Sequence, residues 1–194
     1  MTIWFISDTH FGHDNLVTTF KRSDGSPARA FASAQEMDET MIARWNAVVR
    51  PSDHIYHLGD LTMARGNQTK YIDAIMARLS GHKRILLGNH DQLKSKWYQQ
   101  HFEKVKGSQV FDNLLFTHIP VAPWCHGRFR ANVHGHTHAN GERVYWEMAH
   151  DATTGLFRDV AYVNLSVEQI NYAPVSLEEI KSWIASPPLP KAPF

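Results

Sequence analysis

Seven side chains in five separate segments of the chain are of the types that bind divalent metal ions. Carboxylate, carboxamide and imidazole groups, without a cysteine among them, suit ions of the Mn, Fe(II), Co, Ni or Zn type. Seven ligands are too many for one tetrahedral site and fit two ions that share a bridging ligand. We therefore predict a centre of two divalent transition-metal ions. The candidate ligands are Asp8, His10, Asp60, Asn89, His118, His136 and His138.

Each of these segments follows a short apolar run of strand length. In an α/β sheet, loops from separate strands converge at the carboxyl ends of the strands, and ligand sites form there. The candidate ligands are therefore expected at one edge of the fold. Gly59, Gly88 and Gly135 stand beside them and allow unusual backbone angles or a close approach to the ions. The predicted strands are residues 3–6, 55–58, 85–87, 114–116, 131–133 and 161–165.

Three further segments have the apolar spacing of amphipathic helices. The pairs Ser33 with Glu36 and Ser176 with Glu179 are capping boxes, which predict where two of these helices begin. The first helix continues toward Pro51, the second includes residues 72–79, and the third ends at residues 187–188. Strands alternating with helices in the first half, and more strands in the second half, predict an α/β fold.

Length and composition predict one compact domain of residues 1–186, followed by a proline-rich tail of residues 187–194. The net charge of +1 disfavours a protein that binds nucleic acid without chemistry. A single cysteine, Cys125, excludes an intrachain disulfide and suits a reducing compartment. Asp8 follows the N-terminus too closely for a signal peptide, and no apolar run has the length of a membrane span. We expect a cytoplasmic protein without a membrane partner, of unknown oligomeric state.

The polar segments resemble, in order and spacing, the five-block signature of the calcineurin-like metallophosphoesterases. The blocks are Asp8-x-His10, Gly59-Asp60, Gly88-Asn89-His90-Asp91, His118 and Gly135-His136-x-His138. Residues 31–49 and 163–180 also resemble small bacterial and phage members of that superfamily. The resemblance implies a four-layered α/β/β/α sandwich with two packed mixed sheets. It also implies the division of ligands: Asp8, His10 and His138 for one ion, Asn89, His118 and His136 for the other, and Asp60 as the bridge.

The function implied is that of a dinuclear metal-dependent phosphoesterase. We expect a phosphodiesterase that hydrolyses small phosphodiesters by in-line attack of a metal-bridging hydroxide. His90 is the predicted general acid or transition-state stabiliser, and Asp91 is predicted to orient it. A phosphomonoesterase or a nuclease would use the same centre. A non-catalytic protein-interaction scaffold of the same fold is the alternative from another class.

Substrate contacts are predicted in the first metal loop and in two other loops. His13 continues the metal loop, and arginine and tryptophan side chains offer phosphate binding and base stacking. Both of these other loops could equally be solvated surface. The expected substrate is a small phosphoester, such as a nucleotide or a nucleic-acid end, and the other histidines are interpreted as structural. The predicted substrate-binding residues are His13, Arg22, Arg29, Trp124, His126 and Arg128.

Overall fold

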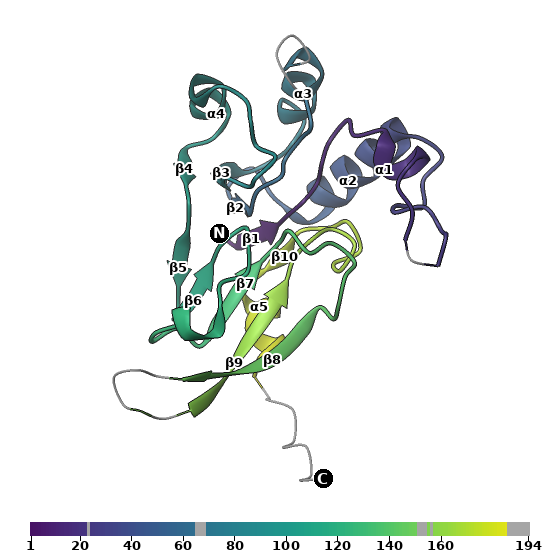
Figure 1. Ribbon diagram of the computed structural model, residues 1–194. Helices are drawn as coiled ribbons and strands as arrows, with labels where there is room; N and C mark the ends of the chain where they lie inside the picture. Colours follow the sequence, from purple (N-terminus) through teal and green to yellow (C-terminus); the bar gives the residue numbers. More distant parts are fainter. Residues whose placement is uncertain (23, 65–68, 151–154, 156, 186–194) are drawn as a thin grey trace.

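The computed structural model describes residues 1–22, 24–64, 69–150, 155 and 157–185. The predicted tail of residues 187–194 lies outside these ranges. The described chain forms two five-stranded sheets and five α-helices, with the two sheets packed together (Figure 1). This mixed α/β arrangement confirms the predicted sandwich of two mixed sheets.

Strand order explains why distant segments of the chain can meet at one place. The first sheet has the order β10-β1-β2-β3-β4, and β1 to β4 run parallel to one another. The second sheet has the order β5-β6-β7-β9-β8, and β6, β7 and β9 are parallel. The strands of the first sheet are β1 (Ile3–Ile6), β2 (His54–His57), β3 (His82–Leu86), β4 (Lys104–Lys106) and β10 (Val175–Ser176). Those of the second are β5 (Gln109–Phe111), β6 (Leu114–Phe116), β7 (Ala131–His134), β8 (Val144–His150) and β9 (Phe157–Asn164).

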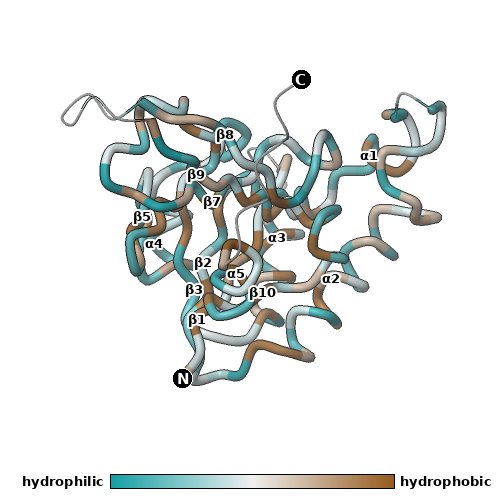
Figure 2. Tube along the Cα trace, turned by 90° about the horizontal axis from the view of Figure 1, so that it is seen from below, coloured by the Kyte–Doolittle hydropathy of each residue, from teal (hydrophilic) through white to brown (hydrophobic). Residues whose placement is uncertain are grey.

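Aromatic rings hold the two sheets against each other. The Phe5 ring of β1 stacks on the Phe116 ring of β6, with 4.3 Å between centroids, and Tyr56 of β2 meets Phe111 of β5 at 5.1 Å. Buried rings contribute a large apolar area and prefer such stacked or edge-on geometries. In Figure 2, hydrophobic stretches lie in the middle of the molecule among β1, β2, β3 and β7. This shared core fixes the strands of one sheet relative to those of the other.

The helices are α1 (Asn15–Thr18), α2 (Ala34–Val48), α3 (Thr69–Met76), α4 (Ser95–His101) and α5 (Leu177–Trp183). A hydrogen bond joins α2 to the chain that follows α3, because the Trp45 indole donates to the Ser80 carbonyl. Another joins α4 to α3, because the Trp97 indole donates to the Asp73 carboxylate. Helix α5 contacts β10 and β1, and Arg130 beside β7 donates to the Ile184 carbonyl at its end. No helix within the described residues is long and apolar enough to cross a membrane.

The two predicted capping boxes differ in the structure. At α5 the box is complete, because Ser176 and Glu179 satisfy each other's backbone N–H groups. At α2 the Ser33 hydroxyl accepts from the Glu36 N–H, but the Glu36 carboxylate accepts from the Ala32 N–H instead of from Ser33. The helix therefore begins where predicted, with only half of the predicted box.

Candidate metal centre

The predicted ligands all lie just beyond the carboxyl ends of parallel strands, at one edge of the sandwich. They follow β1, β2 and β3 in the first sheet and β6 and β7 in the second. Backbone hydrogen bonds continue past the strands: the Asp8 N–H donates to the Gly59 carbonyl and the His10 N–H to the Asp60 carbonyl. Ser7 likewise donates to Leu165, which joins the loop after β1 to the second sheet. Both sheets therefore contribute to one rigid site.

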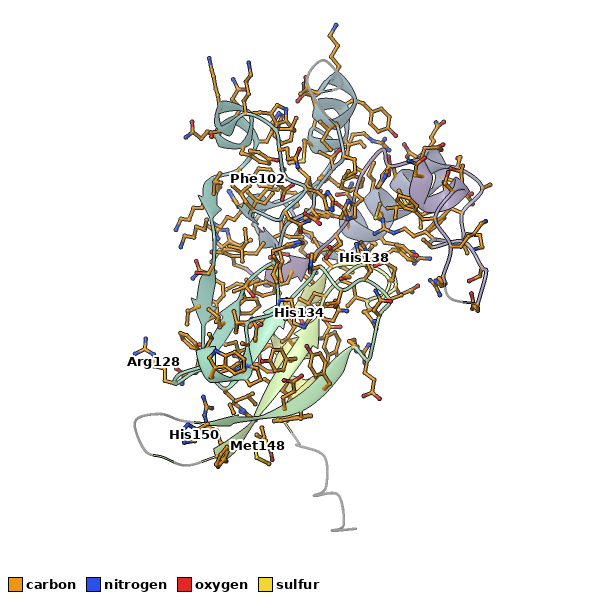
Figure 3. The ribbon with its side chains drawn as sticks, viewed as in Figure 1. Phe102, Arg128, His134, His138, Met148 and His150 are labelled. Carbon is orange, nitrogen blue, oxygen red and sulfur yellow. The ribbon has the colours of Figure 1, made fainter. Side chains whose placement is uncertain are left out.

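The first group of ligands consists of Asp8, His10 and His138, and one potential ligand atom of each lies within 4.8 Å of the others. The His138 Nδ1–H donates to Glu168 at 3.1 Å, so the Nε2 of the neutral ring carries a lone pair. This nitrogen lies 3.8 Å from a carboxylate oxygen of Asp8. Figure 3 labels His138 in the middle of the molecule, close to β1. A cation between these two acceptors would satisfy both.

The second group consists of Asp60, His118 and His136, again with ligand atoms within 4.8 Å of one another. His118 donates its Nδ1–H to the Leu58 carbonyl at 2.9 Å, which leaves Nε2 as a lone pair in the neutral ring. That nitrogen faces the Asn89 Oδ1 at 2.9 Å and an Asp60 carboxylate oxygen at 3.3 Å. Three acceptors that face one another repel, unless a proton or a metal ion lies between them.

Asp60 lies between the two groups. The same carboxylate oxygen that faces His118 is 3.7 Å from the Nε2 of His10, which belongs to the first group. The other oxygen accepts the His90 backbone N–H at 2.8 Å, so the carboxylate is held in this orientation. This is the position that a ligand shared by two ions requires.

The backbone around the ligands is strained, with five ligands in the left-handed region. This conformation costs a residue other than glycine about 1–2 kcal/mol, and it persists only where the surrounding structure enforces it. Such clusters of strained residues are typical of functional sites. The strained ligands are Asp8, His10, Asp60, His136 and His138, with φ angles of 57°, 48°, 56°, 69° and 51°.

Two glycines are needed because no side chain fits beside the carboxylates. A Cβ atom at Gly88 would lie 2.2 Å from an Asp60 carboxylate oxygen, and one at Gly135 would lie 2.3 Å from an Asp8 carboxylate oxygen. Both distances are far inside van der Waals contact. The glycines therefore let the neighbouring backbone approach the ligands, as their positions in the sequence predicted.

Burial and neighbouring titratable groups shift the pKa values of the carboxylates and imidazoles in the centre. Burial raises the pKa of Asp8, although His138 and His118 oppose the effect, and burial lowers the pKa of His10 well below its usual value. For Asp60, burial favours the neutral acid, but the hydrogen bond and charge of His118 outweigh it and bring the pKa to about 2. Metal ions displace protons from such ligands. Buried carboxylates facing imidazole lone pairs are therefore the donor set that two divalent ions fit.

Asp91 has a different role from the one predicted. Its carboxylate accepts backbone N–H groups of Asp60 and Gly88 at 2.8 Å each and of Leu61 at 3.0 Å. Burial raises its pKa to about 6, although these three bonds favour the charged form. Within the described residues, no hydrogen bond joins Asp91 to the His90 ring. The prediction that it orients His90 is therefore corrected: Asp91 positions the Asp60 loop.

His90 lines a pocket beside the first group of ligands. Its ring centroid is 5.6 Å from that of His10, and the ring takes no place in either group. The pocket has a volume of about 810 Å³. His13 and Arg22 line it, together with Phe20, Lys21 and Asn140. The structure therefore brings two predicted substrate contacts, His13 and Arg22, to the same pocket as His90.

Arg29 does not contact this pocket. Its side chain is completely buried, and it donates to the carbonyl oxygens of Asp8 and Thr9 at 2.6 and 2.7 Å. Its Nε donates to Glu168 at 2.8 Å, and the Glu168 carboxylate also accepts the Nδ1–H of His138. The prediction that Arg29 binds substrate is corrected, because its guanidinium instead holds the first metal loop and, through Glu168, a predicted ligand.

The predicted contacts in the loop before β7 also lie elsewhere. His126 is completely buried, with its ring 4.8 Å from the Tyr162 ring, so it cannot meet substrate. Trp124 is 74% exposed but is absent from the pocket lining. In Figure 3, Arg128 lies far from His138, near His150 and Met148 at the other end of the second sheet. These three residues are therefore not assigned to substrate binding.

Two supporting residues of the centre were not predicted. The Ser166 hydroxyl donates to Asp8 at 3.1 Å, and Glu168 links Arg29 to His138. Both follow β9, a parallel strand that ends at the same edge as the others. The polar cluster after residues 161–165 was visible in the sequence, and the strand-end rule applied to it would have indicated both. His57, interpreted as core or supporting, connects two metal loops by bonds to Thr9 and Gly59.

Glu168→Gln should weaken ion binding at the first group. Outer partners of metal-bound histidines are worth about 10–100-fold in affinity. We expect a loss of this size for one of two ions, measured by calorimetric titration of apoprotein with Mn²⁺. Glu39→Gln is the matched control, because Glu39 pairs with Arg78 on the surface. Equal affinities in the two variants would contradict the role assigned to Glu168.

Comparison with known proteins agrees with this geometry. The family model described as calcineurin-like phosphoesterase matches residues 1–173. An uncharacterized protein of Methanocaldococcus jannaschii is 32% identical over 182 residues, covering 94% of this chain and 90% of that protein. The Gene 66 protein of Mycobacterium phage L5 is 29% identical over 136 residues, and the match covers 69% of this chain and 58% of the phage protein.

A solved structure has the same fold. The crystal structure of a protein of unknown function from Aquifex aeolicus superposes with a TM-score of 0.66 and 25% sequence identity, covering 94% of this chain and 98% of that chain. The family match spans all seven candidate ligands and every strand of the two sheets except β10. The chain therefore belongs to the calcineurin-like phosphoesterase family and is a metal-dependent phosphoric ester hydrolase.

Proposed function

We propose that this hydrolase is a phosphodiesterase for small phosphodiesters, with a nucleotide or a nucleic-acid end as the substrate. The observation that carries the proposal is the pocket of about 810 Å³ that extends from His10, His138 and His90 to Phe20. An organic group on the phosphate can occupy this space while the phosphate stays at the metal centre. A diester has such a group on each side of the phosphorus.

The walls of the pocket suit a nucleotide. Leu16, Phe20 and Met63 form apolar surface, and Phe20 stands edge-on to His13 with 5.8 Å between ring centroids. Exposed aromatic rings of this kind stack on nucleobases. Lys21 and Arg22 supply positive charge beside them. The Arg22 guanidinium donates to the Ala28 carbonyl, which holds it along this wall.

The chemistry assigns roles to the residues of the centre. Two divalent ions, of the Mn, Fe, Zn, Co or Ni type, would be held by the seven ligands, and when bound they lower the pKa of a shared water and offset phosphoryl charge. Asp60 keeps both ligand groups together, and Asp91 fixes the Asp60 loop. His90 faces the pocket without a place in either group, so it is free to donate a proton to the leaving oxygen.

A panel of metals and substrates tests this proposal. Apoprotein is loaded with Mn, Fe(II), Co, Ni or Zn and assayed with an aryl phosphodiester, the matching monoester and an end-labelled single strand. We expect kcat/KM to be highest for the diester. A higher value for the monoester would replace the proposal with a phosphomonoesterase, and cleavage within the labelled strand would replace it with a nuclease.

Arg22→Ala should raise KM for a nucleotide diester about tenfold and leave kcat nearly unchanged. Loss of a charge-assisted hydrogen bond at an exposed position weakens substrate binding by about this factor. The bound substrate and the transition state lose the same stabilisation, so kcat is unchanged. Trp124→Ala is the control, because Trp124 lies outside the pocket lining. If both variants have the wild-type KM, or if both raise it equally, Arg22 does not contact the substrate.

His90→Ala should lower turnover by about 10²–10⁴ for a leaving group of high pKa, because the leaving oxygen loses its proton donor. The loss should shrink with a nitrophenolate, which departs without a proton. Metal content, measured by elemental analysis, should stay at the wild-type level. His150→Ala is the control, since His150 lies at the far end of the second sheet (Figure 3). An equal loss for both leaving groups would exclude His90 as the general acid.

A further inference from the structure

Three potential metal ligands gather at the opposite end of the first sheet from the metal centre. His54 begins β2, His82 begins β3, and Glu103 immediately precedes β4. One potential ligand atom of each residue lies within 4.8 Å of the others. Because β2, β3 and β4 are parallel, their amino ends lie at the edge away from Asp8 and Asp60. This His-His-Glu cluster is therefore separate from the dinuclear centre.

Strand pairing places these side chains together. His54 and His82 are direct partners in the β2–β3 ladder, and their rings lie 5.3 Å apart. The Glu103 N–H donates to the Lys83 carbonyl at 2.9 Å just before β4, and the Glu103 carboxylate lies beside His82 and Arg84. The three side chains therefore meet at the edge of the sheet, and none of the three residues has a positive φ.

The donor atoms converge on one point. The His82 Nδ1 and a Glu103 carboxylate oxygen are only 2.5 Å apart, while the other Glu103 oxygen accepts from Arg84 at 3.1 Å. The His54 Nδ1 is shielded from solvent and has no hydrogen-bond partner among the described residues.

We propose that His54, His82 and Glu103 form a third metal site, specific for a Zn²⁺-type ion with a fourth position open to water. Two imidazoles and one carboxylate are a ligand set that zinc uses. A tetrahedral site with bonds of about 2.0–2.2 Å separates its donor atoms by roughly 3.4 Å. The Glu103 oxygen must therefore move away from the His82 Nδ1, and the exposed side chains of both residues can rotate to allow this. Arg84 lies close to the site, and its charge limits the affinity.

Such an ion would join the starts of three adjacent strands. β4 has only three residues and is at the edge of the first sheet. The metal–ligand bonds would hold β4 to β3 in addition to the few backbone hydrogen bonds between these strands. Binding to the folded state alone raises stability with ion concentration. The ion would thus stabilise this edge of the sheet, and its binding does not depend on the substrate proposed above.

Equilibrium dialysis of the untagged full chain against Zn²⁺, followed by elemental analysis, tests the site. Wild-type protein should hold about three ions per chain, and His54→Ala and His82→Ala about two, because losing a ligand costs at least the 10–100-fold known for outer partners. His101→Ala is the matched control, since His101 pairs with Asp73 on α4 and α3 and should keep about three. The Zn²⁺-induced rise in Tm should be smaller in the two cluster variants than in the control.

Hydrolytic activity separates this site from the dinuclear centre. The cluster variants should keep wild-type activity, since both residues lie at the other end of the sheet. Equal zinc content in wild type, cluster variants and control would overturn the proposal. Wild-type protein that holds only two ions and is active would overturn it as well, without affecting the phosphodiesterase proposal. If wild-type protein binds the third ion as expected but is inactive, the result would count against the phosphodiesterase proposal alone.

Discussion

Two carboxylates, Asp8 and Asp60, are buried where the two sheets meet, with exposed fractions of 0% and 1%. An ionised group away from water costs several kcal/mol unless a partner compensates it. The partners here are imidazole rings whose second nitrogens are committed to Leu58 and Glu168, so their lone pairs also face inward. The site thus concentrates acceptors, which require cations or protons among them. Two divalent ions satisfy this requirement, and the other features of the structure serve to hold the acceptors in place.

The fold meets that requirement with elements from both sheets. Six parallel-paired strands, β1, β2, β3, β6, β7 and β9, lead into the loops of the site at one edge, and the aromatic core between Phe5 and Phe116 keeps the two sheets aligned. The loops turn at once through left-handed residues, and Gly88 and Gly135 leave room for them. Arg29 binds the first loop from inside the protein and links it to Glu168. Stability and function are therefore provided by the same contacts, because the strained loops depend on the core that positions them.

Much of this arrangement could be predicted from local patterns. Apolar runs followed by aspartate and histidine indicated the strand ends, and the Ser176 box indicated the start of α5. Four strands were missed, namely β4, β5, β8 and β10, because they are short or have exposed residues in place of an apolar run. An edge strand is stabilised by pairing with its neighbouring strand, and the hydrophobic pattern of its own residues does not indicate that neighbour. The sequence therefore predicted the centre of each sheet better than its edges.

The site residues show the same limit. The candidate ligands were recognised as a set because a rule relates them to strand ends, and the structure brings them together. Arg29 was misassigned because the fate of a long cationic side chain depends on Glu168, 139 positions away. His126 was misassigned because the ring of Tyr162 in β9 buries it. Local sequence indicates which residues can bind phosphate, but only packing decides which of them reach the pocket.

The proposed metal centre depends on one ligand, Asp60, being shared between two ions. A crystal structure of protein loaded with Mn²⁺, with anomalous difference density collected at the manganese edge, tests it most directly. We expect two peaks about 3.5–4 Å apart on either side of the Asp60 carboxylate, one beside His10 and one beside His118. A single peak, or two peaks that Asp60 does not contact, would contradict it.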